Sequence, residues 1–206
     1  VARDIDGAMM QGILATLDGI RSDYSALMKT LLTDTSIKNR TVGVGTIGYD
    51  EAVALSMVGP FARASAVNYD VRSFGRGAYG DLADFQPILD NQGDCYARVK
   101  VRCLEVLQSI DIIRELAAKM PAGDIAVAVK GSPAAGAQAS NVLEPPRGEC
   151  YYYARGNGTK HLDRMRMRTP TSQNLAGMAT ALKGCALADV NMIILTIDPC
   201  ISCTER

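Results

Sequence analysis

Two cysteines near the end of the sequence, Cys200 and Cys203, have the residue type and spacing for metal or redox chemistry. The Cys-x-x-Cys spacing places two thiols on one tight turn, and thiolates are the ligands that soft metal ions prefer. Asp198 and Pro199 precede them, and a proline fixes its own φ while disfavouring helix for the residue before it. We therefore expect a stiff elbow that presents two sulfur atoms. Taken alone, the spacing leaves open a redox pair, half of a zinc site and a chance occurrence.

The residues around the two cysteines narrow these possibilities. The string Asp-Pro-Cys-x-x-Cys-x-x-Arg at 198–206 resembles the C-terminus of nickel–iron hydrogenase large subunits. The longer string 197–206 is similar to the energy-converting, membrane-bound branch, which includes the carbon-monoxide-induced hydrogenases. Two more stretches match in the family's own order, namely Pro-Pro-Arg-Gly at 145–148 and Thr-Pro-Thr at 169–171. That branch shares ancestry with the quinone-side subunit of respiratory complex I.

The resemblance implies two metal ligands. In the family, these stretches converge on a nickel–iron centre whose iron carries carbon monoxide and cyanide ligands. Cys200 would be a terminal thiolate on nickel, and Cys203 would bridge nickel and iron. Soft sulfur ligands suit this pair of metals, and metal binding deprotonates the thiols.

The resemblance also implies four residues around the metals. Arg147 and Asp198 would be catalytic: the guanidinium, which stays charged at any working pH, would hang over the open coordination position, and the carboxylate would hold it by a charge-assisted pair. Pro146 and Thr171 would bind the cofactor. Pro146 would shape the same canopy, and Thr171 would donate its hydroxyl to a cyanide nitrogen and so tune the iron.

One departure from the family bears on what the chain can do. The family has a second cysteine pair nearer its N-terminus, with the proton-accepting glutamate beside it, and this sequence has no other Cys-x-x-Cys. The sequence also begins with Val1 in place of methionine. We therefore expect residues 1–206 to be the C-terminal portion of the domain that forms a hydrogenase large subunit, without the N-terminal half. Alone it should supply two of four metal thiolates, hold no nickel–iron cluster and be inactive.

The resemblance implies partners and a location as well. An iron–sulfur small subunit would cover the metal-site side, where we expect an apolar patch, and membrane subunits would be indirect partners. The chain would be cytoplasmic, peripheral on the cytoplasmic side of the inner membrane. With 22 basic and 22 acidic residues, the composition gives no electrostatic reason to expect nucleic acid as a partner. No apolar run approaches the ~20 residues of a membrane span, so we expect no transmembrane helix in this sequence. We expect the six cysteines to be reduced thiols.

Two other function classes remain open at this point. A complex-I-like subunit of an NADH-quinone oxidoreductase would act as a scaffold that lines a quinone cavity and needs no metal. Such a scaffold has no use for a thiolate pair on the elbow, so Cys200 and Cys203 favour the hydrogenase. A small zinc module would use the same two cysteines as half of its site, but the sequence offers no second close Cys or His pair.

A further stretch, residues 59–72, resembles the Gly-Pro-x-x-Arg-x-Ser-Gly-x-x-x-Asp-x-Arg segment of both branches, with Ala66 in place of the last glycine. Arg63, Asp70 and Arg72 place a carboxylate between two guanidiniums. We interpret them as a structural ion-pair network under the site. The functional alternative is that Arg63 lies near a route for protons or electrons.

The elements that must position these residues follow from hydrophobic periodicity and turn signals. Apolar residues at spacings of three and four predict two long helices, at 4–32 and 94–119, and we interpret the first as a core helix. The turn Gly156-Asn157-Gly158 predicts a β-hairpin at 148–167. We expect a short edge strand at 83–89, a loop at 122–141, and a helix capped by Thr171 or Ser172. The expected fold is mainly α (α+β): one hydrogenase large-subunit-like helical domain with a small β-hairpin.

Overall fold

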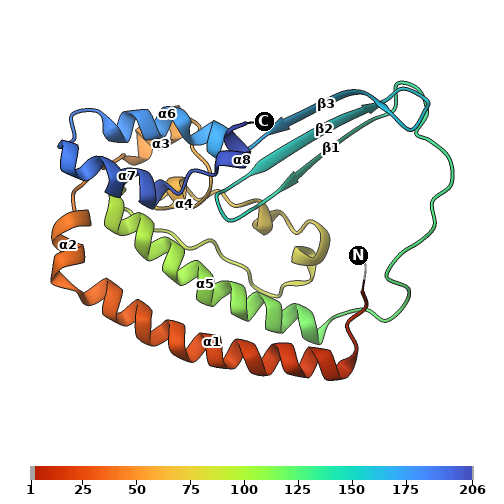
Figure 1. The fold of residues 1–206 in the computed structure, drawn as a ribbon, viewed down its shortest axis with the longest axis horizontal. Coiled ribbons are helices and arrows are strands. Elements are labelled where there is room, and N and C mark those ends of the chain that lie inside the picture. The colour runs from red at the N-terminus through yellow and green to blue at the C-terminus, as the bar shows by residue number, and fades with distance from the viewer. Residues whose placement is uncertain (1–2, 206) are drawn as a thin grey trace.

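The computed structural model describes residues 3–205, and its framework is a pair of long helices that lie along one another (Figure 1). Helix α1 spans Gly7–Thr33 and helix α5 spans Cys95–Ala118. Each begins where an aspartate side chain accepts a backbone N–H of the first turn, Asp6 from Met9 and Asp94 from Ala97. Both predicted long helices are therefore confirmed to within a few residues.

Shorter helices make up the rest of the helical part. They follow the chain in the order α2 Thr35–Thr41, α3 Tyr49–Ala54, α4 Gly59–Arg63, η1 Val71–Phe74, η2 Gly77–Asp81, α6 Pro170–Leu182, η3 Leu187–Asp189, α7 Val190–Ile197 and α8 Ile201–Thr204. Helix α2 lies at the end of α1, whereas α3, α4, α6, α7 and α8 group together on the other side of α5 (Figure 1).

The sheet has three antiparallel strands in the order β1-β2-β3, and it projects away from the helices (Figure 1). Strands β2 (Cys150–Gly156) and β3 (Leu162–Arg168) confirm the predicted hairpin. The loop expected at 122–141 is confirmed for residues 122–137 and is wrong for 138–141, where strand β1 (Gln138–Leu143) begins. Its polar sequence carries no apolar alternation, and only pairing with β2, from Gln138↔Arg155 to Leu143↔Cys150, makes it a strand.

The hydrophobic core lies around the short helices. Its buried members come from α3, α4, the start of α5, α6 and α7, and from the segments next to α3: Ile47, Ala52, Met57, Phe61, Ala62, Cys95, Ala181, Ile193 and Ile197. Because α6 and α7 carry the residues that lead to Cys200, burial of this core fixes where the C-terminal elbow lies.

Helix α1 is not a core helix, which corrects our interpretation. None of its residues is buried, and Leu27 on its outer side is 60% exposed. Its main neighbour in the described chain is α5, so only one side of its apolar pattern is covered.

The edge strand expected at 83–89 is also wrong. This segment runs over α5, where the Ala83 N–H donates to Glu115 and the Gln86 carbonyl accepts from Gln108, and none of the strands in the described chain pairs with it. Pro87 has no N–H to offer a ladder. The fold class, mainly α with a small antiparallel sheet, is nevertheless confirmed. Among residues 3–205, no helix is both long and apolar enough to cross a bilayer.

Candidate metal centre

The cysteine elbow begins with a sharp reversal at Asp198. Helix α7 ends at Ile197, and Asp198 takes the left-handed conformation, with φ 59° and ψ 57°. Aspartate tolerates this region better than most residues, and Pro199 prevents the helix from continuing. Cys200 then starts the one-turn helix α8, and its carbonyl accepts the N–H groups of Cys203 and Thr204. The expected elbow is therefore present, with both thiols on it.

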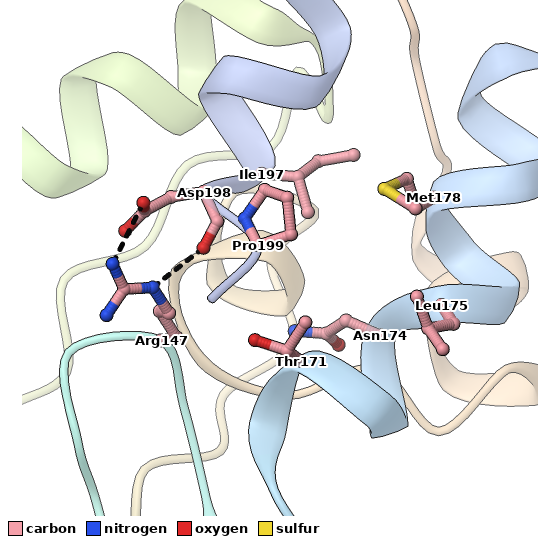
Figure 2. Close-up of a pocket in the computed structure, with 8 residues that line it drawn as sticks. All are labelled: Arg147, Thr171, Asn174, Leu175, Met178, Ile197, Asp198 and Pro199. Atoms are coloured by element: carbon pink, nitrogen blue, oxygen red, sulfur yellow. Dashed lines mark hydrogen bonds and ion pairs between the residues drawn. The ribbon is translucent and has the colours of Figure 1, made fainter. Parts of the chain in front are cut away.

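Arg147 and Asp198 form the expected pair (Figure 2). Arg147 Nε donates to the Asp198 backbone carbonyl over 2.8 Å, and Nη2 donates to Oδ1 over 3.1 Å. Two contacts from one guanidinium fix its plane as well as its position. The guanidinium thereby lies beside the turn that carries the thiols.

A second arginine, Arg102 on α5, also binds the elbow, and the sequence motifs did not indicate it. Its Nη2 donates to the Ile197 carbonyl over 2.7 Å, and its Nη1 lies 3.4 Å from Asp198 Oδ2. The strained Asp198 thus lies between two guanidiniums. The available signal was the run Arg98, Arg102 and Glu105, which places three charged residues on one face of an otherwise amphipathic helix.

Two threonines of the Thr-Pro-Thr stretch hold the backbone of both cysteines. Thr171 Oγ1 accepts the Cys200 N–H over 3.1 Å, and Thr169 Oγ1 donates to the Cys203 carbonyl over 2.6 Å. The N-cap of α6 is Thr169, not Thr171 or Ser172 as expected, because Pro170 fits the first helical position. That difference leaves the buried Thr171 hydroxyl free to face the elbow (Figure 2).

A close backbone contact between Gly59 and Gly148 positions the neighbouring Arg147. Gly59 has φ +70° and Gly148 has φ +122°, both in the region that side chains disfavour. A Cβ on Gly59 would collide with the Arg147 carbonyl oxygen, and a Cβ on Gly148 would lie 2.7 Å from the Gly59 nitrogen. The Gly-Pro and Pro-Pro-Arg-Gly stretches therefore both require glycine for the same reason: their backbones approach each other too closely for a side chain.

The two thiols differ in acidity. The Ser202 hydroxyl, the Cys203 N–H and thiol, and the Arg147 charge lower the pKa of Cys200 to about 7. Burial, followed by the neighbouring Cys200 thiol, raises the pKa of Cys203 above its ordinary value. Cys200 is therefore the sulfur that is more readily available as a thiolate.

Pro146 and Thr171, the two residues expected to bind the cofactor, line different cavities. Arg147, Thr171 and Asp198 line one small pocket with Asn174, Pro199 and neighbouring apolar side chains (Figure 2). Pro146 instead lines a larger cavity of about 540 Å³ on the α5 side, together with Arg102, Glu105 and Glu144.

The expected ion-pair network also forms. Arg63, 1% exposed, lies 2.8 Å from Glu105, 2.8 Å from Glu144 and 3.1 Å from Asp70, and Arg72 lies 2.6 Å from Asp70. Glu105 and Glu144, which come from distant parts of the chain, were not foreseen.

The donor set fits one half of a two-metal thiolate site. Two adjacent thiols, one of low pKa, are what a soft metal requires on this side. Within residues 3–205, no group of three or more His, Cys, Asp or Glu side chains could hold a metal ion. Of the other four cysteines, all free thiols, Cys95 and Cys150 are buried, and Cys103 and Cys185 are half-buried. A closed site would need donors besides these two sulfurs.

Comparisons with known proteins agree with the resemblance seen in the motifs. The sequence model of the family described as respiratory-chain NADH dehydrogenase, 49 kDa subunit, matches residues 1–135 and 126–206. The carbon monoxide-induced hydrogenase of Rhodospirillum rubrum is 40% identical over 84% of this chain and 48% of its own length. The alpha subunit of the membrane-bound hydrogenase of Pyrococcus furiosus is 32% identical over 100% and 52%. A subunit of the NADH-quinone oxidoreductase of Dehalococcoides mccartyi is 32% identical over 90% and 50%. The chain thus spans about half the length of these relatives.

Proposed function

This chain belongs to the family of the 49 kDa subunit of respiratory-chain NADH dehydrogenase, and we propose that it serves the hydrogenase branch of that family. In this proposal, residues 1–206 are the C-terminal part of the catalytic subunit of an energy-converting nickel–iron hydrogenase. The whole subunit is an oxidoreductase that interconverts protons and hydrogen with electrons exchanged through an iron–sulfur partner.

One observation supports this proposal most: the two thiols lie on one turn, backed by the Thr169 and Thr171 hydroxyls and flanked by the Arg147–Asp198 pair. A quinone scaffold needs a cavity wall, and it has no need of two sulfur atoms with a positioned guanidinium beside them. A redox disulfide pair needs the sulfurs but not two separate threonine contacts to their backbone.

In this function, Cys200 and Cys203 would hold the nickel–iron group, and sequence outside this chain would supply the remaining thiolates. A bound nickel–iron group supplies the chemistry of splitting or forming hydrogen heterolytically. The protein's own residues do the rest. Arg147 would present a fixed positive charge, Asp198 and Arg102 would orient the elbow, and the Thr171 hydroxyl, which accepts the Cys200 N–H here, would also bind a ligand of the iron.

The partners in this proposal are an iron–sulfur small subunit and, through it, membrane subunits. Two relatives are named as parts of a membrane-bound hydrogenase and of an F(420)H(2) dehydrogenase, which supports a place in a multi-subunit complex. Ile201, between the two cysteines, is 74% exposed, and Leu195 on α7 is also exposed. Apolar side chains beside the site support a protein partner on that face.

The second candidate is the complex-I-like scaffold that lines a quinone cavity. It is favoured by the similarity to the NADH-quinone oxidoreductase relative and by the cavity beside Pro146. In that function the thiols would be idle, and their replacement would leave quinone reduction intact.

Nickel analysis and a hydrogen-uptake assay on the complete subunit test the proposal. Cys200→Ser and Cys203→Ser should each abolish nickel content and hydrogen turnover together, because serine oxygen is a poor ligand for a soft metal. Cys185→Ser, at a half-buried cysteine distant in sequence from the elbow, is the matched control and should change neither. Full hydrogen turnover in Cys203→Ser would overturn the hydrogenase assignment and leave the quinone scaffold.

A further inference from the structure

The ion-pair cluster under the site holds more acids than bases. Three carboxyl groups, Asp70, Glu105 and Glu144, share two guanidiniums, Arg63 and Arg72. Exposure of these five side chains is between 0% and 12%. Arg102 lies nearby but is bound to the Thr196 and Ile197 carbonyls and to Asp198. These five side chains by themselves therefore carry one negative charge in excess if all three acids are ionised, and the Arg102 guanidinium beside them, which also acts on Glu105, is shared with Asp198.

An uncompensated charge in a buried cluster is costly, so one of the acids should hold a proton. Asp70 accepts from both guanidiniums and from the Arg72 N–H, which is more donors than either glutamate has. Glu105 is the most exposed of the three. Glu144 has one guanidinium, Arg63, and a long contact to the Val71 N–H. Burial raises the pKa of Glu144, and the Asp70 charge adds to this rise, so that the Arg63 charge does not offset it.

Glu144 also lines two cavities, as do Arg72 and Tyr79. One is the cavity of about 540 Å³ that Pro146 and Arg102 line, and the other, of about 240 Å³, lies toward η2 and β1. Both exceed the roughly 30 Å³ that one water molecule occupies, and charged side chains line both. Arg102 joins the first cavity to Asp198 and hence to the elbow.

We propose that Glu144 is a proton-transfer residue, a carboxyl that is neutral at rest and passes protons between the water of the two cavities. The carboxylic acid gives its proton to water in one cavity, and the resulting carboxylate takes a proton from water in the other, with no change in oxidation state. The role in turnover rests on the proposed function, because hydrogen chemistry at the thiols releases and consumes protons. The rest state of Glu144 does not depend on it.

The surroundings that set this proton equilibrium come from several elements. The charged and titratable groups near Glu144 are Arg63 on α4, Tyr69, Asp70 and Arg72 at η1, Arg76 and Tyr79 at η2, and Arg102 and Glu105 on α5.

Infrared spectroscopy of this chain, without metal, tests the rest state. At pH 7 the chain should show a protonated carboxylic acid C=O band, which Glu144→Gln removes. In Glu105→Gln the excess negative charge is gone, so Glu144 should be ionised at pH 7. The carboxylic acid band should then appear only at lower pH. Glu149→Gln, a buried glutamate that binds Tyr69 and Arg168 outside the cluster, is the matched control and should keep the band.

The outcomes separate this inference from the proposed function. A band at pH 7 that disappears in Glu144→Gln and moves in Glu105→Gln supports it. Absence of the band in the unaltered folded chain overturns it, whether or not the variants fold, and leaves the hydrogenase proposal untouched. In the complete subunit, Glu144→Gln should slow hydrogen turnover by about 10²-fold with nickel content unchanged. Unaltered turnover there would overturn the transfer role, whereas lost nickel binding in the unaltered subunit would count against the proposed function alone.

Discussion

Within residues 3–205, three residues other than glycine adopt left-handed backbone, namely Ser56, Ala66 and Asp198. For Asp198 the strain has an evident compensation, since its side chain and carbonyl bind Arg147 and Arg102. For Ala66 the side chain offers none. Its N–H is held by the Asp90 and Arg63 carbonyls, so the backbone of the turn imposes the conformation. The glycine that the related segment carries at this position is thereby explained.

Ala66→Gly should stabilise the chain. Left-handed backbone destabilises an alanine by about 1 kcal/mol relative to glycine. This gain should exceed the free-energy cost of the extra conformational entropy that a glycine loses on folding. Thermal or urea unfolding would show a raised midpoint. Ala64→Gly is the control: Ala64 is buried in right-handed backbone, so that change should lower the midpoint. A lower midpoint for Ala66→Gly would contradict the argument.

Arg147→Lys should separate metal binding from turnover in the complete subunit. Lysine keeps the charge but cannot make the two contacts to Asp198 from one planar group. Nickel content should stay, and hydrogen turnover should fall by on the order of 10²-fold, as for the loss of one positioned donor. Metal analysis beside a hydrogen-uptake assay measures both. Equal loss of nickel and turnover would mean that Arg147 acts by holding the elbow in place.

At the scale of elements, α6 acts as a clamp on the C-terminal turn. Its N-cap, Thr169, accepts the Ser172 N–H and donates to the Cys203 carbonyl, and Thr171 in its first turn accepts the Cys200 N–H. The same helix buries Thr171, Asn174, Gly177 and Ala181 against the core. Position of the thiols is thus coupled to packing of α6.

Thr169→Ala should loosen the clamp. Loss of the cap and of the buried contact to Cys203 should lower the free energy of unfolding by roughly 1–2 kcal/mol, and the turn at 198–205 should become more sensitive to carboxypeptidase digestion. Thr169→Ser keeps the hydroxyl and should restore most of both. Unfolding midpoints and timed digestion followed by mass spectrometry measure them. If alanine and serine behave alike, the hydroxyl contact is not what holds the turn.

At the scale of the whole molecule, stability is concentrated on one side. The apolar core and the buried ion-pair cluster both lie around α4 and α5, whereas no residue of α1 is buried. Charge in that cluster should therefore make the free energy of unfolding depend on pH.

The sign of the dependence follows from Glu144. Its pKa is higher in the folded chain than the unfolded value of about 4.3, so the folded state binds more protons between the two pKa values. The contribution of Glu144 is therefore fully present below the unfolded pKa and lost as pH rises through the folded pKa. Urea unfolding at stepped pH should show this fall, and Glu144→Gln should abolish it.

Asp90 gives the contrasting case. Burial by itself would raise its pKa, but hydrogen bonds from Lys100 and from the backbone lower it overall. The contribution of Asp90 to the free energy of unfolding is present above its unfolded pKa and is lost as pH falls through its folded pKa, so it affects stability only at acid pH.

For Glu144, a pH slope of the unfolding free energy in Glu144→Gln equal to that of the unaltered chain would contradict the assignment.

The sequence by itself determined the features that depend on neighbours along the chain. Apolar spacing predicts α1 and α5, Gly-Asn-Gly predicts the hairpin turn, and Asp-Pro-Cys-x-x-Cys predicts the elbow. These signals are local, so a few dihedral preferences and one periodicity are enough to carry them. The pairing of Arg147 with Asp198, 51 positions apart, was instead implied by the resemblance to the family.

Only the tertiary structure decided which distant groups meet. Arg102 reaches Asp198 across 96 positions, Gly59 touches Gly148 by backbone, and β1 exists only because β2 pairs with it. The third carboxyl of the buried cluster, Glu144, lies 81 positions from Arg63. Such contacts depend on helix packing and strand register, which place groups to within an ångström. Composition and spacing leave those placements undetermined, because many arrangements bury the same apolar pattern equally well.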